Sequence, residues 1–128
     1  MSAEQNVKLF SGEAHTACTI YRFVVRDATT KQFDMVSGAQ GEMDGIAAET
    51  VSVVGQSLPI VMMNAGTIAK IESGAAISAG AVLASDSSGR AITAVSGAGN
   101  WEAGKAIDAA SGAGEIIRFM VLKQRDQA

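Results

Sequence analysis

The sequence predicts an all-β fold, a small barrel-like or sandwich-like domain built from two tandem pseudo-repeats. Its 11 Val and 10 Ile outnumber 4 Leu, and β-branched side chains suit the pleated surface of a strand. Turn signals recur about every 8–12 residues, a spacing typical of small β-sandwiches and barrels. The second half of the chain also repeats the pattern of the first. With 128 residues, the chain can form one domain with a modest core.

The first half is predicted to contain an N-terminal arm and four strands. Residues 1–19 are polar and mixed, and we expect them to form a flexible arm with strand potential at Val7 to Phe10. Apolar runs then predict strands at 20–25, 32–36, 45–48 and 58–63. A turn is expected at Asp27 to Thr30. Pro59 favours an edge position or the first place in its strand, because proline has no N–H to donate.

The second half repeats this order and ends in a charged tail, 123–128. Strands are predicted at 67–71, 82–84, 90–95, 104–110 and 116–122, with a strong turn signal at Asp86 to Gly89. We therefore expect one β-rich domain over 20–122. Its first repeat spans about 20–63 and its second about 79–122.

A constant offset of 59 residues relates the two halves. It places Gly45 on Gly104 and Gly55 on Gly114, without gaps over about 44 positions. The segment Val36 to Ala39 then falls on Val95 to Ala98 with all four residues identical, and the run 58–63 falls on 117–122. Phe23 is matched with Val82, Lys31 with Arg90 and Phe33 with Ile92. One copy of about 45 residues buries too little surface to fold alone, so two copies are expected to share a core.

Composition argues against several classes of function. The net charge is −3, no run of Lys or Arg occurs, and the six aromatic residues are scattered, so we expect no nucleic-acid partner. No stretch reaches the roughly 18 apolar residues that span a bilayer, and the N-terminus does not read as a secretory signal, so no membrane partner is expected. Cys18 is the single cysteine and is expected to be a small, partly buried thiol.

One segment comes close to a phosphate-binding loop. Residues 99–105 match G-x-x-x-x-G-K, but Ala106 stands where the Mg²⁺-binding Ser or Thr belongs. Gly112 and Gly114 leave little room for the helix that such a loop requires. The first repeat has no Lys at the equivalent place, so we interpret the segment as a structural loop.

The remaining candidate residues give no catalytic site. His15 is the only histidine, and in a strand or loop it would point away from Cys18, three residues on, so an exposed His is expected. The acidic residues 27, 34, 42, 44 and 49 are spread through turns and are expected to be solvated. The sequence therefore predicts no catalytic, cofactor-binding or metal-binding residues. Trp101, the lone Trp, is expected to pack in the core or to anchor an interface.

Several of these motifs resemble a family of small tailed-phage proteins, the head decoration or cement proteins. The resemblance rests on Gly45-Ile-Ala-Ala-Glu, Gly55-Gln-Ser-Leu-Pro-Ile-Val, Asp86-Ser-Ser-Gly-Arg, Gly104-Lys-Ala-Ile and Gly114-Glu-Ile-Ile-Arg-Phe-Met-Val-Leu. It covers about residues 20–122. Some such proteins carry labels of RecA-like recombinases, which the incomplete phosphate-binding loop does not support.

The resemblance implies a structural protein rather than an enzyme. It implies a virion protein made in the host cytoplasm, seated as a homotrimer on the outer surface of the capsid at threefold positions, with the major capsid protein as its partner. Val7, Lys8, Leu9 and Phe10 would then contact the shell, by adding a strand to a capsid sheet. Two alternatives are another virion module, such as a tail or fibre base, and a nucleotide-dependent enzyme.

Overall fold

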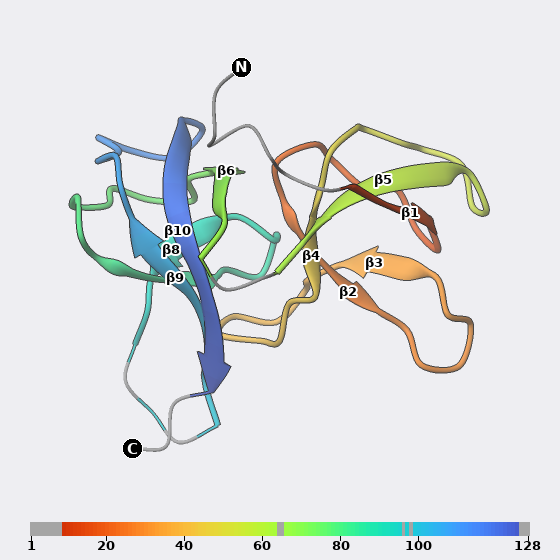
Figure 1. Cartoon of the computed structure of the whole chain (residues 1–128), viewed down its shortest axis with the longest axis horizontal. Coiled ribbons are helices and arrows are strands. Elements are labelled where there is room, and N and C mark those ends of the chain that lie inside the picture. Colours follow the sequence, from red (N-terminus) through yellow and green to blue (C-terminus); the bar gives the residue numbers. More distant parts are fainter. Residues whose placement is uncertain (1–8, 64–65, 96, 98, 126–128) are drawn as a thin grey trace.

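In the computed structural model, which describes residues 9–63, 66–95, 97 and 99–125, ten strands form two five-stranded antiparallel sheets. The sheets lie side by side, the first built from the first half of the chain and the second from the second half (Figure 1). The described residues contain no helix, and therefore none that could cross a membrane as a long apolar helix. The all-β prediction is confirmed.

The two sheets have the same topology. The first has the strand order β1-β5-β4-β2-β3 and the second β6-β10-β9-β7-β8. Leu9 pairs with Val61 across β1 and β5, and Ile68 pairs with Met120 across β6 and β10, so the offset of 59 residues holds in the pairing register as well. The predicted duplication is confirmed. The first sheet consists of β1 (Leu9–Glu13), β2 (Phe23–Arg26), β3 (Phe33–Met35), β4 (Gly45–Ala47) and β5 (Ser57–Met62), and the second of β6 (Ile68–Glu72), β7 (Val82–Ser85), β8 (Ala91–Thr93), β9 (Trp101–Ala106) and β10 (Ile116–Arg125).

Each repeat begins one strand earlier than the sequence pattern indicated. Strand β1 lies within the range expected to be an arm, yet all five of its residues pair with β5. Its counterpart β6 begins at Ile68, before the expected start of the second repeat at residue 79. The repeats therefore run from β1 to β5 and from β6 to β10. Likewise, β10 extends to Arg125, into the range expected to be a tail.

The match between the repeats shifts by one residue at the turn between the second and third strands of each. In the first repeat, the N–H of Asp27 donates to the carbonyl of Gln32 and closes the turn. In the second repeat, the N–H of Asp86 donates to the carbonyl of Arg90. The second turn is thus one residue shorter. Consequently Phe33 corresponds to Ala91 and not, as the ungapped match had it, to Ile92, and each makes the equivalent isolated parallel bridge.

The identical Val residues before the Ser-Gly-Ala segment are also not equivalent in space. Val36 is buried, and its N–H donates to the carbonyl of Phe23 at 3.0 Å. Val82 is the counterpart of Phe23, and its carbonyl accepts a hydrogen bond from the N–H of Ala94 at 2.7 Å. Val95 is instead 60% exposed. The offset of 59 is restored beyond this point, where Gln40 and Gly99 both have a positive φ.

Pro59 does not mark an edge strand, because β5 lies between β1 and β4. Its carbonyl accepts a hydrogen bond from the N–H of Ala48 at 2.9 Å, one residue beyond the end of β4. In an antiparallel pair, a residue's N–H and C=O point to the same neighbour. The missing N–H of Pro59 therefore falls where the β4 ladder has already ended, and the sheet tolerates it.

The paired glycines Gly45 and Gly104 are required by close strand approach. A Cβ at Gly45 would collide with the side chain of Ile60, and one at Gly104 would collide with the carbonyl of Met120. Gly104 also has a φ of 147°, a conformation that favours glycine. The same crossing of the fourth strand over the fifth thus occurs in both repeats.

Two clusters of buried side chains form the core. The larger is common to both repeats and contains Phe23, Met43 and Ile46 from the first together with Leu83 and Phe119 from the second, among others. The smaller belongs to the first repeat alone. The sequence predicted one core shared by the two copies; the structure has this shared core and, in addition, a separate one.

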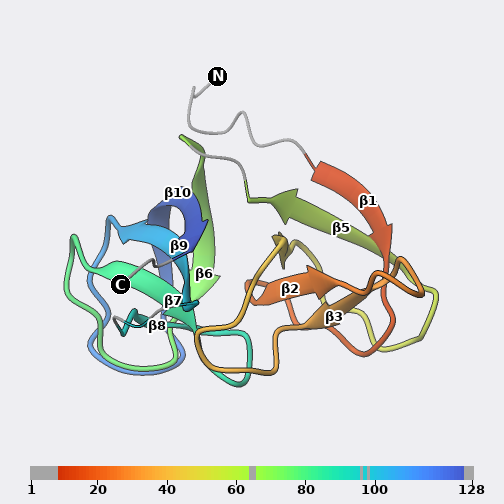
Figure 2. The same cartoon turned by 90° about the horizontal axis from the view of Figure 1, so that it is seen from below.

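The repeats also meet through hydrogen bonds and an aromatic pair. The N–H of Glu72, at the end of β6, donates to the carbonyl of Tyr21 at 2.8 Å, and the N–H of Phe23 donates to the carbonyl of Gly89 at 2.7 Å. The ring of Phe23 packs edge-on against Phe119, with 6.1 Å between centroids. The edge strand of the second sheet therefore stands against a face of the first, as the two views show (Figures 1 and 2).

Candidate interaction surfaces

The segment that resembles a phosphate-binding loop is a strand. Residues 101–106 form β9, which pairs with β10 on one side and β7 on the other. Lys105 is exposed on this strand, and no helix begins after it among the described residues. Backbone N–H groups that pair within a sheet are not available to cradle a phosphate. Trp101, which was expected in a loop, is the first residue of β9.

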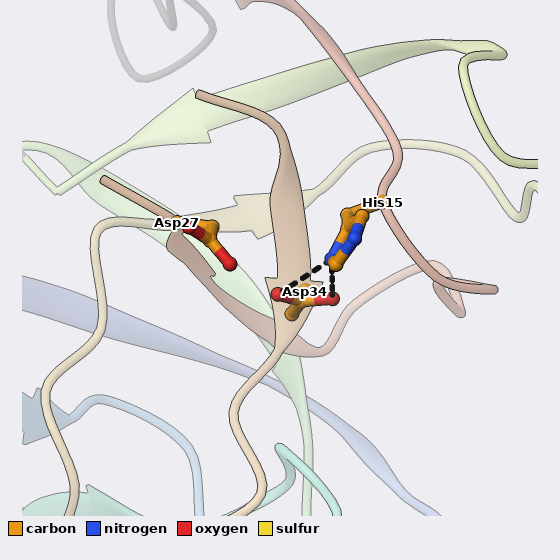
Figure 3. A group of neighbouring side chains, drawn as sticks. All are labelled: His15, Asp27 and Asp34. Carbon is orange, nitrogen blue, oxygen red and sulfur yellow. Dashed lines mark hydrogen bonds and ion pairs between the residues drawn. The ribbon is translucent and has the colours of Figure 1, made fainter. Parts of the chain in front are cut away.

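His15, Asp27 and Asp34 come together at one end of the first sheet (Figure 3). Nδ1 of His15 lies 3.1 Å from a carboxylate oxygen of Asp34. One carboxylate oxygen of Asp27 accepts hydrogen bonds from the backbone N–H groups of Thr29 and Thr30, which hold the pKa of that carboxyl below its usual range. His15 is half-buried rather than exposed as expected.

These are atom types that divalent cations bind, but contacts within the chain account for their positions. The hydrogen-bond contact between His15 and Asp34 fastens the segment after β1 to β3, and Asp27 closes the turn before β3. A contact of this kind contributes modestly to stability at a partly exposed site. We therefore interpret the cluster of His15, Asp27 and Asp34 as structural.

Cys18 is buried, with 1% of its surface exposed. It is bridged to Val51 by backbone hydrogen bonds in both directions, each 2.9 Å. Burial, with a smaller effect of the Asp34 carboxylate, raises the pKa of its thiol to about 11. A thiol that stays protonated near neutral pH is a poor nucleophile, so Cys18 acts as a packing residue. Its thiol donates hydrogen bonds to the carbonyls of Thr16 and Phe33 and not to His15.

Five of the nine large apolar side chains that are exposed in the described part of the chain lie on two surfaces. The first, the β1 edge, consists of Leu9, Phe10 and Glu13 on the outermost strand of the first sheet; Leu9 is 58% exposed and Phe10 47%. The ring of Phe10 lies 6.1 Å from that of Phe33, which leaves its outer side open to solvent.

The second surface, the outer face of the second sheet, consists of Val82, Lys105, Ile107, Met120 and Leu122. Along β10 the side chains alternate, with Ile117, Phe119 and Val121 buried and the intervening residues exposed. Met120 is 50% exposed and Leu122 46%. A strand that is apolar on both faces, one of them facing water, is unusual for a monomeric antiparallel sheet and marks a contact surface.

A cleft of about 330 Å³ lies between the two repeats. The first repeat contributes mainly apolar residues, among them Leu9, Ile46 and Val61, and the second contributes Ile68 with Lys70 and Arg118. Arg118 makes a two-pronged ion pair with Asp108, with both N–O distances 3.0 Å. The cleft is a shallow groove along the junction of the repeats rather than a chemically equipped active site.

Of the predicted contact residues, the structure describes Leu9, Phe10 and Trp101. Val7 and Lys8 lie outside the described residues. Trp101 is half-buried against the shared core, and the Nζ of Lys123 lies 5.1 Å from its ring centroid. Lys123 also contacts Glu42 and Asp44 of the first repeat at 3.1 Å each. Trp101 therefore helps to join the repeats, and its use as an anchor for a partner stays a prediction.

Sequence reasoning missed the outer face of the second sheet. The signal was present as the run Ile116 to Leu122, in which nearly every position is apolar. Such a run predicts a strand buried on both faces, and nothing in the run itself indicates that one of these faces is exposed.

Comparison with known proteins agrees with this picture of a binding module. A family model described as phage cement protein matches residues 13–121. The base of the head fiber gp8.5 of bacteriophage phi29 is similar in structure, with a TM-score of 0.71, at 16% sequence identity; the match covers 95% of this chain and 98% of that one. At that identity the likeness establishes the fold. No curated protein sequence matches the chain significantly.

Proposed function

Because the chain belongs to the phage cement protein family, we propose that it binds the outer surface of a phage capsid as a homotrimer at threefold positions and stabilises the shell. It is a capsid-associated structural protein of a phage, and the proposal concerns its place on the shell, its oligomeric state and its partner. The observation that carries the proposal is the family match, which spans most of both repeats.

The chemistry of the surface supports a protein partner. The chain has a net charge of −3, which disfavours contact with packaged DNA and suits the outside of the shell. Five of the nine large apolar residues that are exposed in the described part of the chain lie on two surfaces, which fits burial in a protein–protein contact. The major capsid protein is the proposed partner.

The N-terminal segment is the proposed shell contact. The prediction concerned Val7, Lys8, Leu9 and Phe10. Because Leu9 and Phe10 already pair with β5 on one side, a capsid strand could join β1 only at its other edge. Residues up to Lys8 would then extend the contact onto the shell.

A binding experiment with undecorated capsids tests the proposal. Purified chain is mixed with capsids that lack it, and occupancy is measured by sedimentation and by electron microscopy. We expect saturable binding at threefold positions and a higher temperature of capsid disruption. A truncation that removes residues 1–8 leaves β1 in place and should weaken binding, whereas Val54→Asp, in an exposed turn, should not. Absence of binding to capsids by the full chain contradicts the proposal.

A fibre base is the second candidate, and the likeness to the phi29 head fiber base favours it. In that case the chain would sit on the virion as a platform for a further protein. Electron microscopy of decorated particles separates the candidates, because a platform carries density beyond its own two sheets. The strand conformation of residues 101–106 gives no support to a nucleotide-dependent enzyme. We expect the wild type and Lys105→Ala to show the same ATP binding, both at the background level of the assay.

A further inference from the structure

We propose that copies of this chain associate by repeating their internal contact: the β1 edge of one copy packs on the outer face of the second sheet of the next copy, as β6 packs on the first sheet within the chain. The inference rests on the proposed homotrimer and specifies its interface. In the trimer a neighbouring copy then occupies the free edge of β1, and of the predicted shell-contact residues only Val7 and Lys8 are left for the capsid. It follows from the offset of 59 residues, which gives several residues of the internal contact counterparts that are exposed or half-buried.

The internal contact provides the template. On the first sheet, its face includes Phe23, Ile46 and Val61, and Phe23 and Ile46 are almost completely buried. On the second sheet, β6 approaches this face with Ile68 and Ala69, and Ala69 is 6% exposed. Phe23, Ile46 and Ala69 are therefore covered within a single chain, while Val61 and Ile68 are half-buried beside the cleft.

The counterparts of both sides lack such cover. Phe23, Ile46 and Val61 correspond to Val82, Lys105 and Met120 on the outer face of the second sheet; Lys105 is exposed and Met120 is 50% exposed. Ile68 and Ala69 correspond to Leu9 and Phe10 on the β1 edge, which are 58% and 47% exposed.

The exposed apolar residues concentrate on these two surfaces. Nine large hydrophobic side chains are exposed in the described part of the chain. Five of them belong to the proposed contact: Leu9, Phe10, Ile107, Met120 and Leu122. Ala48, the counterpart of Ile107, lines the internal cleft, and Met63, the counterpart of Leu122, packs on the shared core. A second copy would cover the exposed parts of these five side chains.

The differences between the internal and the external contact suit association between separate chains. Lys105 stands where the internal contact has buried Ile46, and Glu102 stands where it has buried Met43. The external surface is thus more polar, which keeps a free chain in solution.

The contact is heterologous, because two different surfaces of the chain meet. Such a contact either closes into a ring or grows into a filament. In a closed homotrimer, three chains present six similar sheets around one axis, and each β1 edge is covered by a neighbour. The sheets of one chain are turned relative to one another (Figure 1), as successive units of a ring must be.

Two complementary variants test the contact. Phe10→Asp damages the β1 edge and Met120→Asp damages the outer face, while Val54→Asp, at a residue 64% exposed in a turn, serves as control. Molar mass by light scattering should show trimers for the wild type and the control. Each test variant should shift the concentration of half-dissociation at least about tenfold upward. Circular dichroism confirms that each variant folds.

Mixing the two variants gives the sharpest readout. Each retains one intact surface, so an equimolar mixture should form one-to-one dimers that neither variant forms alone and that do not close into trimers. If both variants remain trimeric, the contact is wrong although the homotrimer stands. If the wild type is monomeric both in solution and on the capsid, the homotrimer itself fails.

A crosslink gives a second test that does not depend on weakening the assembly. Within the chain, Arg22 and Glu72 form an ion pair at 3.3 Å, and their counterparts are Ala81 and Glu13. The double variant Glu13→Cys/Ala81→Cys, treated with a short bis-maleimide, should give covalent dimers and trimers. Neither single variant should give trimers, and buried Cys18 should not react. Only monomers from the double variant, under conditions where trimers exist, would overturn the contact.

Discussion

Phe23 joins the two repeats, and its truncation should destabilise the whole molecule. It is fully buried in the shared core and packs edge-on against Phe119 of the other sheet. A Phe→Ala change in a core costs roughly 3–5 kcal/mol, and the lost aromatic pair adds to that by about 0.5–1.5 kcal/mol. We therefore expect Phe23→Ala to lower the free energy of unfolding by about 4 kcal/mol or more, a large part of the stability of a domain of this size.

Urea denaturation, followed by the fluorescence of Trp101, measures this loss. Trp101 is the only tryptophan and lies in the second repeat, so it reports on Phe23 only if the repeats unfold together. With a denaturant slope of about 2 kcal/mol per M, the midpoint should fall by about 2 M. The protein must be monomeric in the assay, because self-association adds its own stability.

The counterpart of Phe23 provides a matched control. Val82 occupies the same place in the second repeat but is only half-buried, so Val82→Ala should cost about 1 kcal/mol. A loss for Phe23→Ala no greater than that for Val82→Ala would refute the reasoning, since it would mean that the internal contact does not bind the two sheets together.

Three further predictions concern single sites. Gly104→Ala should destabilise by at least about 2 kcal/mol, because its Cβ would meet the opposed strand and its φ is 147°, whereas Gly112→Ala, in open space, should change urea stability by less than about 0.5 kcal/mol. Hydrogen bonds from Arg118 lower the pKa of Asp108 from 3.8 to about 2. The stability that this pair contributes is present above pH 4 and is lost as the pH falls towards 2. The melting temperature of Asp108→Asn should therefore depend less on pH between 4 and 2 than that of the wild type, and an equal dependence counts against the pair. Cys18 should resist a thiol reagent at pH 8 in the native protein and react fully in guanidinium; rapid native labelling would contradict its burial.

The repetition of the fold could be predicted from the sequence because glycines at matched places fix the same backbone crossings. Gly45 and Gly104 are required by strand approach in both repeats, and such positions tolerate little change. The turn after the second strand tolerates a change of one residue, since Asp27 and Asp86 each close it with a side-chain hydrogen bond. The ungapped comparison therefore misplaced Phe33.

The first strand of the first repeat could not be assigned from its own sequence, whereas its counterpart in the second repeat was predicted at 67–71. Strand β1 buries little of its own surface, with four of its five residues exposed, and so lacks the alternation that identifies a half-buried strand. What fixes it is pairing with β5, a contact between residues about 50 positions apart. Its counterpart β6 alternates clearly because the first sheet covers one side of it.

The candidate surfaces overlap only in part with the predicted contact residues. Leu9 and Phe10 were predicted to contact the shell from the family resemblance and their place in the N-terminal segment. The structure has both exposed on an edge strand, and their contact with a shell stays a prediction. Met120 and Leu122 were not identified, because an apolar residue in a strand gives no indication of whether another chain covers it. The structure of a single chain with an internal repeat supplies that information, since one copy shows how the other is covered.

Electron microscopy of capsids incubated with the purified chain tests the central claim most directly. The account predicts density for three copies around each threefold position on the outer surface, with the six sheets arranged in a ring and the β1 edge of each copy against the second sheet of its neighbour. Density at these positions that contains isolated single copies, or no added density on the shell, would contradict it.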